Sequence, residues 1–300
     1  MIFVNIACYR DRECVPTLRD LFEKARYPDQ INVGIILQTL PEDGIAVAHD
    51  RVVVGHVDAS KSMGVCWARA LGYQLWRGEQ FVLQIDSHMR FAPNWDVLLL
   101  AQLAACPSRK PLLTTYPPAY EPPNELISDK PAFLAAKEFG LGGVLLQQAV
   151  MEPTPTTPKP TAFVAAGFLF GPAAWIREVP YDPRLYFHGE ETTLAARLWT
   201  NGWDFFGPTE AIIWHQYAKV ERARHWEDAR QWGELDALSL ARVRQLLGMR
   251  PAAGDAPVDL TGYGLGSVRT LDQYQAMSGI NFCDQTIAPH ALIGDFALVP

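Results

Sequence analysis

The chain has 300 residues, of which 49% are hydrophobic and 20% charged, a composition typical of a globular protein and not of a disordered or fibrous one. Its 26 Lys and Arg stand against 33 Asp and Glu, and the resulting net charge of -7 lacks the basic excess that nucleic-acid backbones require. We therefore expect no nucleic-acid partner.

The N-terminus and the cysteines indicate the compartment. Only residues 2–4 form an apolar run before Asn5, which is too short for a signal peptide. The most apolar stretches, residues 97–105 and 162–170, fall short of the roughly 18 residues of a membrane-spanning helix. The five cysteines are scattered without a CxxC spacing, which argues against a disulfide framework and a zinc site. We expect a cytoplasmic protein with no transmembrane segment.

The first half of the chain alternates short apolar runs with stretches of helical spacing. We expect a helix that is capped by Ser62 and ended by Gly78. The order strand-helix-strand-strand-helix-strand-helix-strand predicts a largely parallel sheet flanked by helices. The other expected elements are strands at residues 2–6, 31–37, 52–57, 81–85 and 112–115, and helices at residues 16–25 and 93–105.

The second half is less regular, with proline-rich loops at residues 117–131 and 153–160. We interpret residues 1–220 as one α/β catalytic domain and residues 221–300 as a C-terminal extension of helices and loops. The expected elements of this half are strands at residues 143–147, 162–170 and 212–215, and helical regions at residues 190–201, 222–248 and 271–277.

A carboxylate and an imidazole stand two residues apart after the fourth expected strand, at Asp86 and His88. Alternate residues of an extended segment share one side, so both side chains can ligate one ion. Mixed carboxylate and imidazole ligation suits a divalent ion such as Mn²⁺, which can bridge a diphosphate. For this pair alone, a strand-end aspartate beside a solvated histidine is the alternative.

A second polar cluster, Tyr9, Arg10 and Asp11, follows the first expected strand. Ligands of such sheets bind at the carboxyl ends of the strands, so we expect this cluster and the Asp86 cluster to face one crevice. Arg10 and Arg69 are candidates to bind a base, ribose or phosphate, because arginine offers a rigid bidentate fork. A surface ion pair is the alternative for either arginine.

Three more residues are candidates on position alone. His215 ends another expected strand, where a packed or exposed histidine is the alternative to a ligand. Glu190 and Glu191 open an expected helix, where the helix dipole by itself favours negative charge. Adjacent helical residues point about 100° apart, so we expect one glutamate to face the crevice and the other to support the fold, and we favour Glu190 for the crevice.

A glycine-rich stretch, Gly-Tyr-Gly-Leu-Gly at residues 262–266, follows no expected strand and opens no long helix. We interpret it as a flexible loop and expect it, with the short helix after it, to form a mobile cover over a bound ligand.

Read together and in order, these clusters resemble a known family. The run Ile85–His88 resembles the D-x-H metal motif of retaining glycosyltransferases with the GT-A fold, particularly the polypeptide N-acetylgalactosaminyltransferases. Gly189–Glu191, the helix at residues 194–199 and His215 are similar to the downstream carboxylate helix and third metal ligand of that family.

A closer resemblance covers nearly the whole chain. It is to N-acetylglucosaminyltransferases typified by the cytoplasmic enzyme that modifies hydroxyproline in a polypeptide. The segments that carry it are Val4–Asp11 with Cys14, Gly64–Arg69, Gln84–Phe91, Ala166–Phe168, Phe187–Glu191, Tyr263–Gly266 and Arg269–Leu271.

The resemblance implies a GT-A-like mixed sheet, mostly parallel and flanked by helices, and transfer of a sugar from a UDP-sugar with retention of configuration. The implied donor is UDP-N-acetylglucosamine, the implied cofactor is Mn²⁺, and the acceptor is a hydroxyl of a peptide, protein or glycan. The implied site has metal ligands Asp86, His88 and His215, nucleotide-binding residues Tyr9, Arg10, Arg69 and Asp86, and catalytic residues Glu190 and Glu191.

Two other functions remain compatible with these residues. A metal-dependent nucleotide-sugar hydrolase or nucleotidyltransferase would use the same diphosphate site, and a hydrolase would release free sugar without an acceptor. A non-catalytic protein that binds sugar nucleotides would keep the fold without the reaction. The intact set of candidate residues argues against this last alternative.

Overall fold

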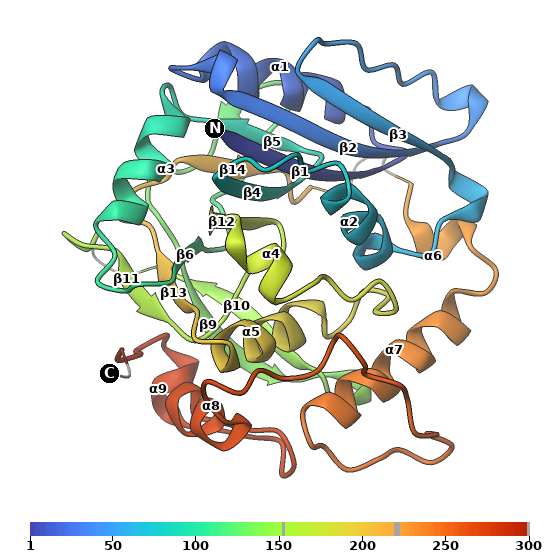
Figure 1. The fold of residues 1–300 in the computed structure, drawn as a ribbon, viewed down its shortest axis with the longest axis vertical. Coiled ribbons are helices and arrows are strands. Elements are labelled where there is room, and N and C mark those ends of the chain that lie inside the picture. Colours follow the sequence, from blue (N-terminus) through green and yellow to red (C-terminus); the bar gives the residue numbers. More distant parts are fainter. Residues whose placement is uncertain (152–153, 219–222, 299–300) are drawn as a thin grey trace.

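A mixed central sheet organises the chain. The computed structural model describes residues 1–151, 154–218 and 223–298. Within them, the sheet contains the strands β1 (Ile2–Tyr9), β2 (Ile31–Thr39), β3 (Val52–Asp58), β4 (Phe81–Asp86), β6 (Pro111–Thr114), β11 (Lys159–Thr161), β12 (Phe168–Pro172) and β13 (Asp204–Gly207). Their order across the sheet is β11-β13-β6-β12-β4-β1-β2-β3 (Figure 1).

Most neighbouring strands of this sheet run in parallel. β1 lies between β2 and β4 and pairs with both in parallel, and β3 extends the parallel set beyond β2. β6 and β13 form a second parallel pair. β12 joins the two sets because it runs antiparallel to both β4 and β6. The expected mostly parallel α/β fold is therefore confirmed, with β12 and the edge strand β11 as its antiparallel members.

Helices lie on both faces of the sheet and around it. They are α1 (Cys14–Lys24), α2 (Val65–Tyr73), α3 (Trp95–Ala104), α4 (Ala174–Glu178), α5 (Glu190–Thr200), α6 (His225–Asp228), α7 (Trp232–Leu246), α8 (Leu271–Ser278) and α9 (Pro289–Leu292). Single 3-10 turns occur at Pro28–Gln30, Pro41–Asp43, Ala59–Lys61 and Leu141–Gly143.

Alternating side chains of the strands build a core on each face. Val4 and Ile6 of β1 pack in one buried cluster with Leu18 of α1 and Trp95 of α3. Phe3, which points the other way, belongs to a second cluster that contains residues of α2, α5, α7 and α8. Burial on both faces explains why these strands are nearly continuous apolar runs.

Small two-stranded sheets complete the structure. They pair β5 (Met89–Phe91) with β14 (Ile213–His215), β7 (Tyr120–Glu121) with β8 (Glu125–Leu126), β9 (Phe133–Phe139) with β10 (Leu145–Val150), and β15 (Ile280–Asn281) with β16 (Thr286–Ile287). The antiparallel β5–β14 pair brings His215 opposite Met89, next to the loop that follows β4.

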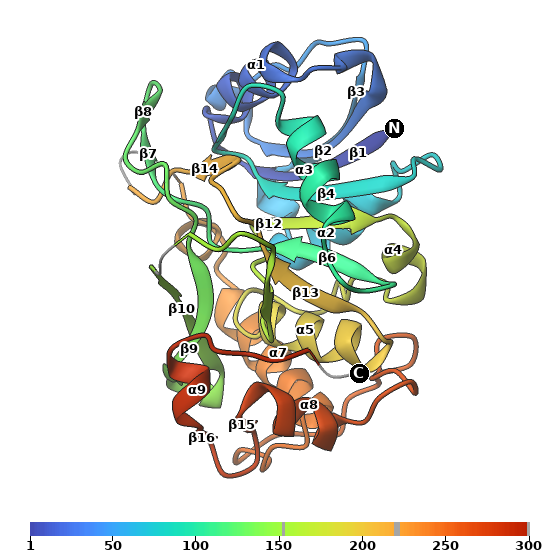
Figure 2. The same cartoon turned by 90° about the vertical axis from the view of Figure 1, so that its left-hand side faces the viewer.

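The C-terminal residues pack against the sheet-bearing part of the chain. Figure 2 shows α7, α8 and α9 gathered at the end of the molecule opposite α1. Val243, Tyr274 and Phe282 are buried in the same hydrophobic cluster as Phe3. No helix in the described part of the chain combines the length and the apolar character needed to cross a membrane.

Several expected boundaries differ from the structure. The stretch at residues 162–170 is not one strand, because the chain turns before β12 and the Thr114 hydroxyl accepts a hydrogen bond from the Ala165 N–H. The strand expected at residues 143–147 is β10, which runs from 145 to 150. α2 begins after Gly64 instead of at a Ser62 cap, and it ends well before Gly78.

The expected helical region at residues 222–248 is divided into α6 and α7. Three expectations involve residues outside the described part of the chain: the start of that region at Arg222, the loop residue Pro153, and the boundary between residues 220 and 221.

Candidate active site

A cleft of about 680 Å³ opens at the carboxyl ends of β1, β2 and β4. Its lining includes Tyr9 and Asp11 after β1, Gln38 of β2, and the 86–88 segment after β4. The expectation that the two polar clusters face one crevice is therefore confirmed for Tyr9, Asp11 and residues 86–88, but not for Arg10. Ligand sites at this edge of an α/β sheet are a general property of parallel strands.

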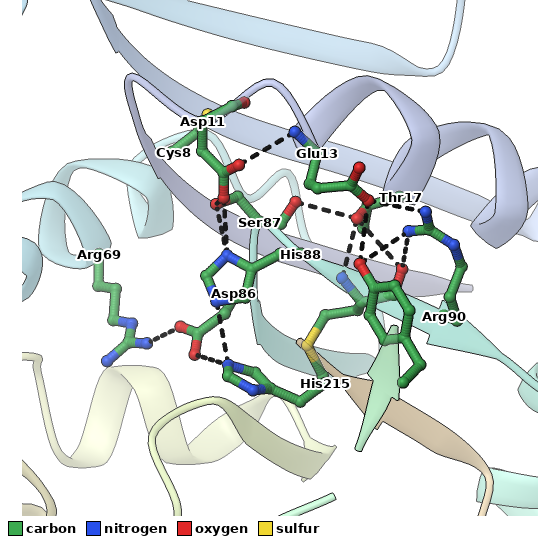
Figure 3. Close-up of polar contacts among 12 residues, drawn as sticks. Cys8, Asp11, Glu13, Thr17, Arg69, Asp86, Ser87, His88, Arg90 and His215 are labelled. Carbon is green, nitrogen blue, oxygen red and sulfur yellow. Dashed lines mark hydrogen bonds and ion pairs between the residues drawn. The ribbon is translucent and has the colours of Figure 1, made fainter. Parts of the chain in front are cut away.

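Asp86, His88 and His215 meet on the wall of this cleft (Figure 3). The Nε2 atoms of the two histidines lie 3.0 Å apart, and the Nε2 atom of His215 lies 3.2 Å from Oδ2 of Asp86. One ligand atom from each residue falls within 4.8 Å of the others. Two imidazole nitrogens and a carboxylate oxygen at this spacing are a donor set that suits a divalent cation.

Backbone pairing brings His215 to this point. Its N–H donates to the carbonyl of Pro118, and the N–H of Gln216 donates to the carbonyl of His88. Together with the β5–β14 ladder, these bonds fix the chain of His215 beside the loop after β4. The three residues predicted as metal ligands are thus close together, although His215 lies far from the other two in sequence.

The loop after β4 is also braced from the first strand and helix. The Asp11 carboxylate contacts the His88 ring, with 2.7 Å between Oδ2 and Nδ1, and it accepts a 2.7 Å hydrogen bond from the Ser87 hydroxyl. Thr17 of α1 donates to the carbonyl of Ser87 and accepts from the N–H of Met89. The sequence indicated the Asp11 cluster but not this contact with His88, because it depends on side-chain directions.

Asp11 and Asp86 are both held in their ionised forms. Burial opposes the ionisation of Asp11, but hydrogen bonds from His88, Ser87 and the Glu13 N–H keep its pKa below the usual value. Burial likewise opposes the ionisation of Asp86, yet Arg69 and the two histidines hold its pKa well below the usual range.

Arg69 is buried behind Asp86 and does not line the cleft. Its guanidinium makes 2.5 Å contacts with Oδ1 of Asp86 and with Oε1 of Glu190. Arg10 also lies outside the lining, and its guanidinium forms ion pairs with Asp43 at 2.9 Å and with Asp228 at 3.0 Å. Of the expected nucleotide-binding residues, Tyr9 and Asp86 line the cleft.

Glu190 and Glu191 have different surroundings. The Glu190 carboxylate is buried and is enclosed by Arg69 and by a hydrogen bond from the Tyr181 hydroxyl. Glu191 is partly buried, and it accepts hydrogen bonds from the Tyr116 hydroxyl at 2.5 Å and the Gln147 amide at 3.0 Å. Burial raises the pKa of Glu191 to about 7. The two glutamates thus differ in their surroundings, and Glu190, which we favoured for the crevice, is the more enclosed of the two. Neither of them is part of the cleft lining, so the expectation that one faces a bound substrate stays a prediction.

Residues of α6 and its neighbourhood form another wall of the cleft. The His225 ring lies between the Ser62 carbonyl, 3.0 Å from Nε2, and the Tyr186 hydroxyl, 2.7 Å from Nδ1. Asp228 accepts a 2.8 Å hydrogen bond from the Tyr9 hydroxyl. No pattern in the sequence indicated this wall, because each contact joins residues that are far apart along the chain.

The glycine-rich stretch lies elsewhere. The N–H of Gly266 donates to the Thr200 hydroxyl at the end of α5, and Tyr263 packs among the arginines Arg184, Arg197 and Arg242. None of residues 262–266, all of which are described, lines the cleft. In this structure the stretch does not border the cleft, whereas part of residues 223–236 does, and the role of residues 262–266 as a mobile cover stays a prediction.

Solved structures show the same fold. GalNAc-T7 with UDP, GalNAc and Mn²⁺ matches with a TM-score of 0.65 and 15% identity over 92% of this chain and 56% of that chain. TarS of S. aureus matches with 12% identity and a TM-score of 0.50 in its UDP-GlcNAc complex, over 81% of this chain and 66% of that one. The UDP complex of TarS matches with 10% identity and a TM-score of 0.51, over 81% of this chain and 72% of that chain.

The chain thus spans slightly over half the length of the GalNAc-T7 structure. No curated protein sequence matches it. A family model described as Glycosyltransferase (GlcNAc) matches residues 1–53 and 41–284, which together cover most of the chain. With its GT-A-like fold and this match, the chain belongs to the GlcNAc glycosyltransferase family.

Proposed function

We propose that this protein is a metal-dependent retaining glycosyltransferase that moves N-acetylglucosamine from UDP-N-acetylglucosamine to a hydroxyl of a peptide, protein or glycan. The observation that carries the proposal is the convergence of Asp86, His88 and His215 in the cleft at the carboxyl edge of the sheet. The family match and the UDP and UDP-GlcNAc in the titles of similar structures support the donor.

The chemistry of the donor set fits a divalent cation. Asp86 supplies a carboxylate kept ionised by Arg69, and the two histidines supply nitrogens in reach of the same point. A cation such as Mn²⁺, when bound there, supplies positive charge that stabilises the diphosphate of the leaving UDP. Arg69 serves this site indirectly, since its guanidinium fixes the Asp86 carboxylate from behind.

The nucleotide is bound beside this cluster. Tyr9 lines the cleft, and its ring meets the His225 ring edge-on with the centroids 5.1 Å apart. Arg10 lies next to Tyr9 and reaches a phosphate by giving up its ion pair with Asp228. This ion pair can be exchanged because the Asp228 carboxylate is partly exposed to solvent. These residues orient the donor, and positioning supplies a large part of the rate acceleration.

Transfer proceeds on one face of the donor sugar. The acceptor oxygen forms its bond to the anomeric carbon on the side from which the UDP oxygen departs, and the acceptor proton passes to an oxygen of the leaving phosphate. No protein base is required for this step. Glu191 orients the sugar or the acceptor hydroxyl from the end of the site near Tyr116, while Glu190 secures Arg69.

The acceptor class rests on resemblance. The segments that resemble hydroxyproline-polypeptide N-acetylglucosaminyltransferases favour a hydroxyl of a peptide, and the aromatic side chains of Phe187 and Trp226 at the cleft suit a proline-like or sugar ring.

A donor screen tests the proposed function. UDP release is measured for a panel of UDP-sugars, with Mn²⁺ or with EDTA, and with peptide or glycan acceptors. We expect release that requires Mn²⁺, is greatest with UDP-N-acetylglucosamine and rises with an acceptor. NMR of the first product should show an α linkage, whereas a β linkage would contradict retention. Free sugar as the sole product would favour a hydrolase.

A further inference from the structure

The contact between Asp11 and His88 defines which ring nitrogen of His88 carries hydrogen. Oδ2 of Asp11 lies 2.7 Å from Nδ1 of His88, and the same oxygen accepts a hydrogen bond from the Ser87 hydroxyl. An ionised carboxylate can only accept hydrogen bonds, so Nδ1 must donate. In the neutral ring the hydrogen is then on Nδ1, and Nε2 has a free electron pair.

The contact at Nε2, on the other side of the His88 ring, is consistent with hydrogen on Nδ1. Nε2 of His88 faces Nε2 of His215 at 3.0 Å, and that atom of His215 also lies 3.2 Å from Oδ2 of Asp86. A hydrogen on Nε2 of His215 has two acceptors there, namely the carboxylate and the electron pair on His88. Figure 3 shows the ring of His88 between Asp11 on one side and the Asp86 and His215 pair on the other.

Asp11 is itself held rigidly. The residue is 3% exposed, and its Oδ1 accepts a 3.0 Å hydrogen bond from the N–H of Glu13 at the start of α1. Both carboxylate oxygens are therefore engaged, one by the backbone and the other by His88 and Ser87. A side chain fixed at both oxygens can determine the orientation of the ring that it contacts.

We propose that Asp11 is a positioning residue that holds His88 by its Nδ1–H and directs the Nε2 electron pair toward a divalent cation shared with Asp86 and His215. The identity of the bound ion rests on the proposed function, but the orientation of His88 rests on the contacts alone. In this role Asp11 acts through His88 and not as a ligand of the ion.

Asp11→Asn separates this role from simple packing. If the amide oxygen takes the place of Oδ2, the amide NH₂ faces the Glu13 N–H, and two donors oppose each other. If the amide is turned, its NH₂ faces Nδ1 of His88 and stabilises the ring form with hydrogen on Nε2. The first arrangement keeps the bond from Nδ1–H but is destabilised by the opposed donors, and the second presents a hydrogen in place of the Nε2 electron pair. The substitution therefore shifts His88 away from the form that binds a cation while leaving the side-chain volume almost unchanged.

The first test reads the ring form without any metal. Long-range ¹H–¹⁵N NMR of the metal-free protein at pH 8 distinguishes the two neutral forms of each histidine, and the His88→Gln variant assigns the signals of His88. We expect hydrogen on Nδ1 of His88 in the natural protein and a shift toward Nε2 in Asp11→Asn. Hydrogen on Nε2 in the natural protein would overturn the proposal, and this arm needs no Asp11 variant to fold.

The second test measures Mn²⁺ affinity directly, from the electron paramagnetic resonance signal of free Mn²⁺. We expect Asp11→Asn to bind Mn²⁺ about 10- to 100-fold more weakly than the natural protein. The matched control is Asp96→Asn, since Asp96 is also 3% exposed and accepts backbone N–H bonds, from Arg26 and Tyr27, outside the cleft. We expect this control to keep the natural Mn²⁺ affinity.

The outcomes separate this proposal from the proposed function. Natural Mn²⁺ affinity in folded Asp11→Asn would overturn the role of Asp11 and leave the metal site intact. Absence of Mn²⁺ binding by the natural protein would overturn both, and the NMR result would then show whether the Asp11–His88 contact exists without a metal role.

Discussion

The buried guanidinium of Arg69 links Asp86 to Glu190, so we expect Glu190 to contribute to the stability of the fold. Glu190→Gln replaces the charged acceptor of Arg69 and Tyr181 by a neutral amide whose NH₂ group opposes one of these donors, while Arg69 keeps its pair with Asp86, so we expect the substitution to lower the free energy of unfolding by about 3 kcal/mol. At pH 6, Glu191→Gln is the matched control and should cost less than about 1 kcal/mol, because glutamine mimics its protonated form. Urea unfolding measures both, and equal losses would contradict this difference.

Glu191 should make stability depend on pH. Burial raises its pKa from 4.5 to about 7 in the folded protein, so the folded state binds the proton more tightly than the unfolded state. The resulting stabilisation, up to about 3 kcal/mol, is complete below pH 4.5 and is lost as the pH rises through 7. Glu191→Gln has no proton to lose at this position, so it lacks this pH-dependent stabilisation. The difference in unfolding free energy between the variant and the natural protein should therefore shift in favour of the variant between pH 5 and 8. Parallel stability curves in urea unfolding would refute the assignment.

At this scale the sequence could predict residue types at strand ends but not their contacts. The convergence of Asp86, His88 and His215 was predicted from their positions at the ends of apolar strands, but His215 reaches the site through the antiparallel β5–β14 pair and not as part of the central sheet. Arg69 was expected at the nucleotide because arginine offers a bidentate fork, whereas it is buried behind Asp86. Burial of a long polar side chain depends on its three-dimensional partners, which no local pattern shows.

The turn before β12 passes directly over the metal-ligand candidates. A Cβ atom added at Gly167 would lie 2.7 Å from Oδ2 of Asp86, so the close approach requires glycine. We expect Gly167→Ala to displace the carboxylate, to weaken Mn²⁺ binding and to cost about 1–3 kcal/mol of stability.

Gly233 in α7 provides the control for this substitution, since no atom lies within 4 Å of its added Cβ. Gly233→Ala should leave Mn²⁺ affinity unchanged and stabilise the helix by up to about 1 kcal/mol. Calorimetric unfolding and Mn²⁺ titration measure both effects, and an unchanged affinity in Gly167→Ala would show that the turn accommodates the methyl group.

The wall formed by residues 223–236 should respond to the nucleotide. Its contacts with the rest of the cleft are side-chain hydrogen bonds at partly exposed groups, such as the bond between Tyr9 and Asp228. We expect amide exchange in this segment to slow when UDP and Mn²⁺ are added, with no change at residues 262–266, which pack against α5. If exchange slowed only at residues 262–266, the result would instead support the prediction that this glycine-rich stretch covers a bound ligand.

Among the elements, the parallel strands β1, β2, β3, β4 and β6 were predicted because each is a short apolar run, whereas the parallel strand β13 was not predicted. The failures lie where tertiary contacts override local preference: the apolar stretch at residues 162–170 turns because Thr114 binds the Ala165 N–H. The wall at α6 could not be predicted, because its position depends on contacts with Ser62, Tyr9 and Tyr186.

On the scale of the whole molecule, the C-terminal residues and the sheet share one core. Val243, Tyr274 and Phe282 are buried in the cluster that contains Phe3 of the first strand. We therefore propose that residues 221–300 form an extension of the catalytic domain and not a separately folding unit. The sequence pattern predicted the extension, but amphipathic periodicity alone does not show which core an apolar face joins.

The most direct test of the metal-dependent nucleotide site is the affinity for UDP with and without Mn²⁺, measured calorimetrically for the natural protein and for His215→Ala. We expect Mn²⁺ to tighten UDP binding at least about 10-fold in the natural protein, because a cation held by Asp86, His88 and His215 would attract the diphosphate. In His215→Ala most of this gain should disappear. Equal UDP affinity with and without Mn²⁺ in the natural protein would contradict a metal-dependent nucleotide site.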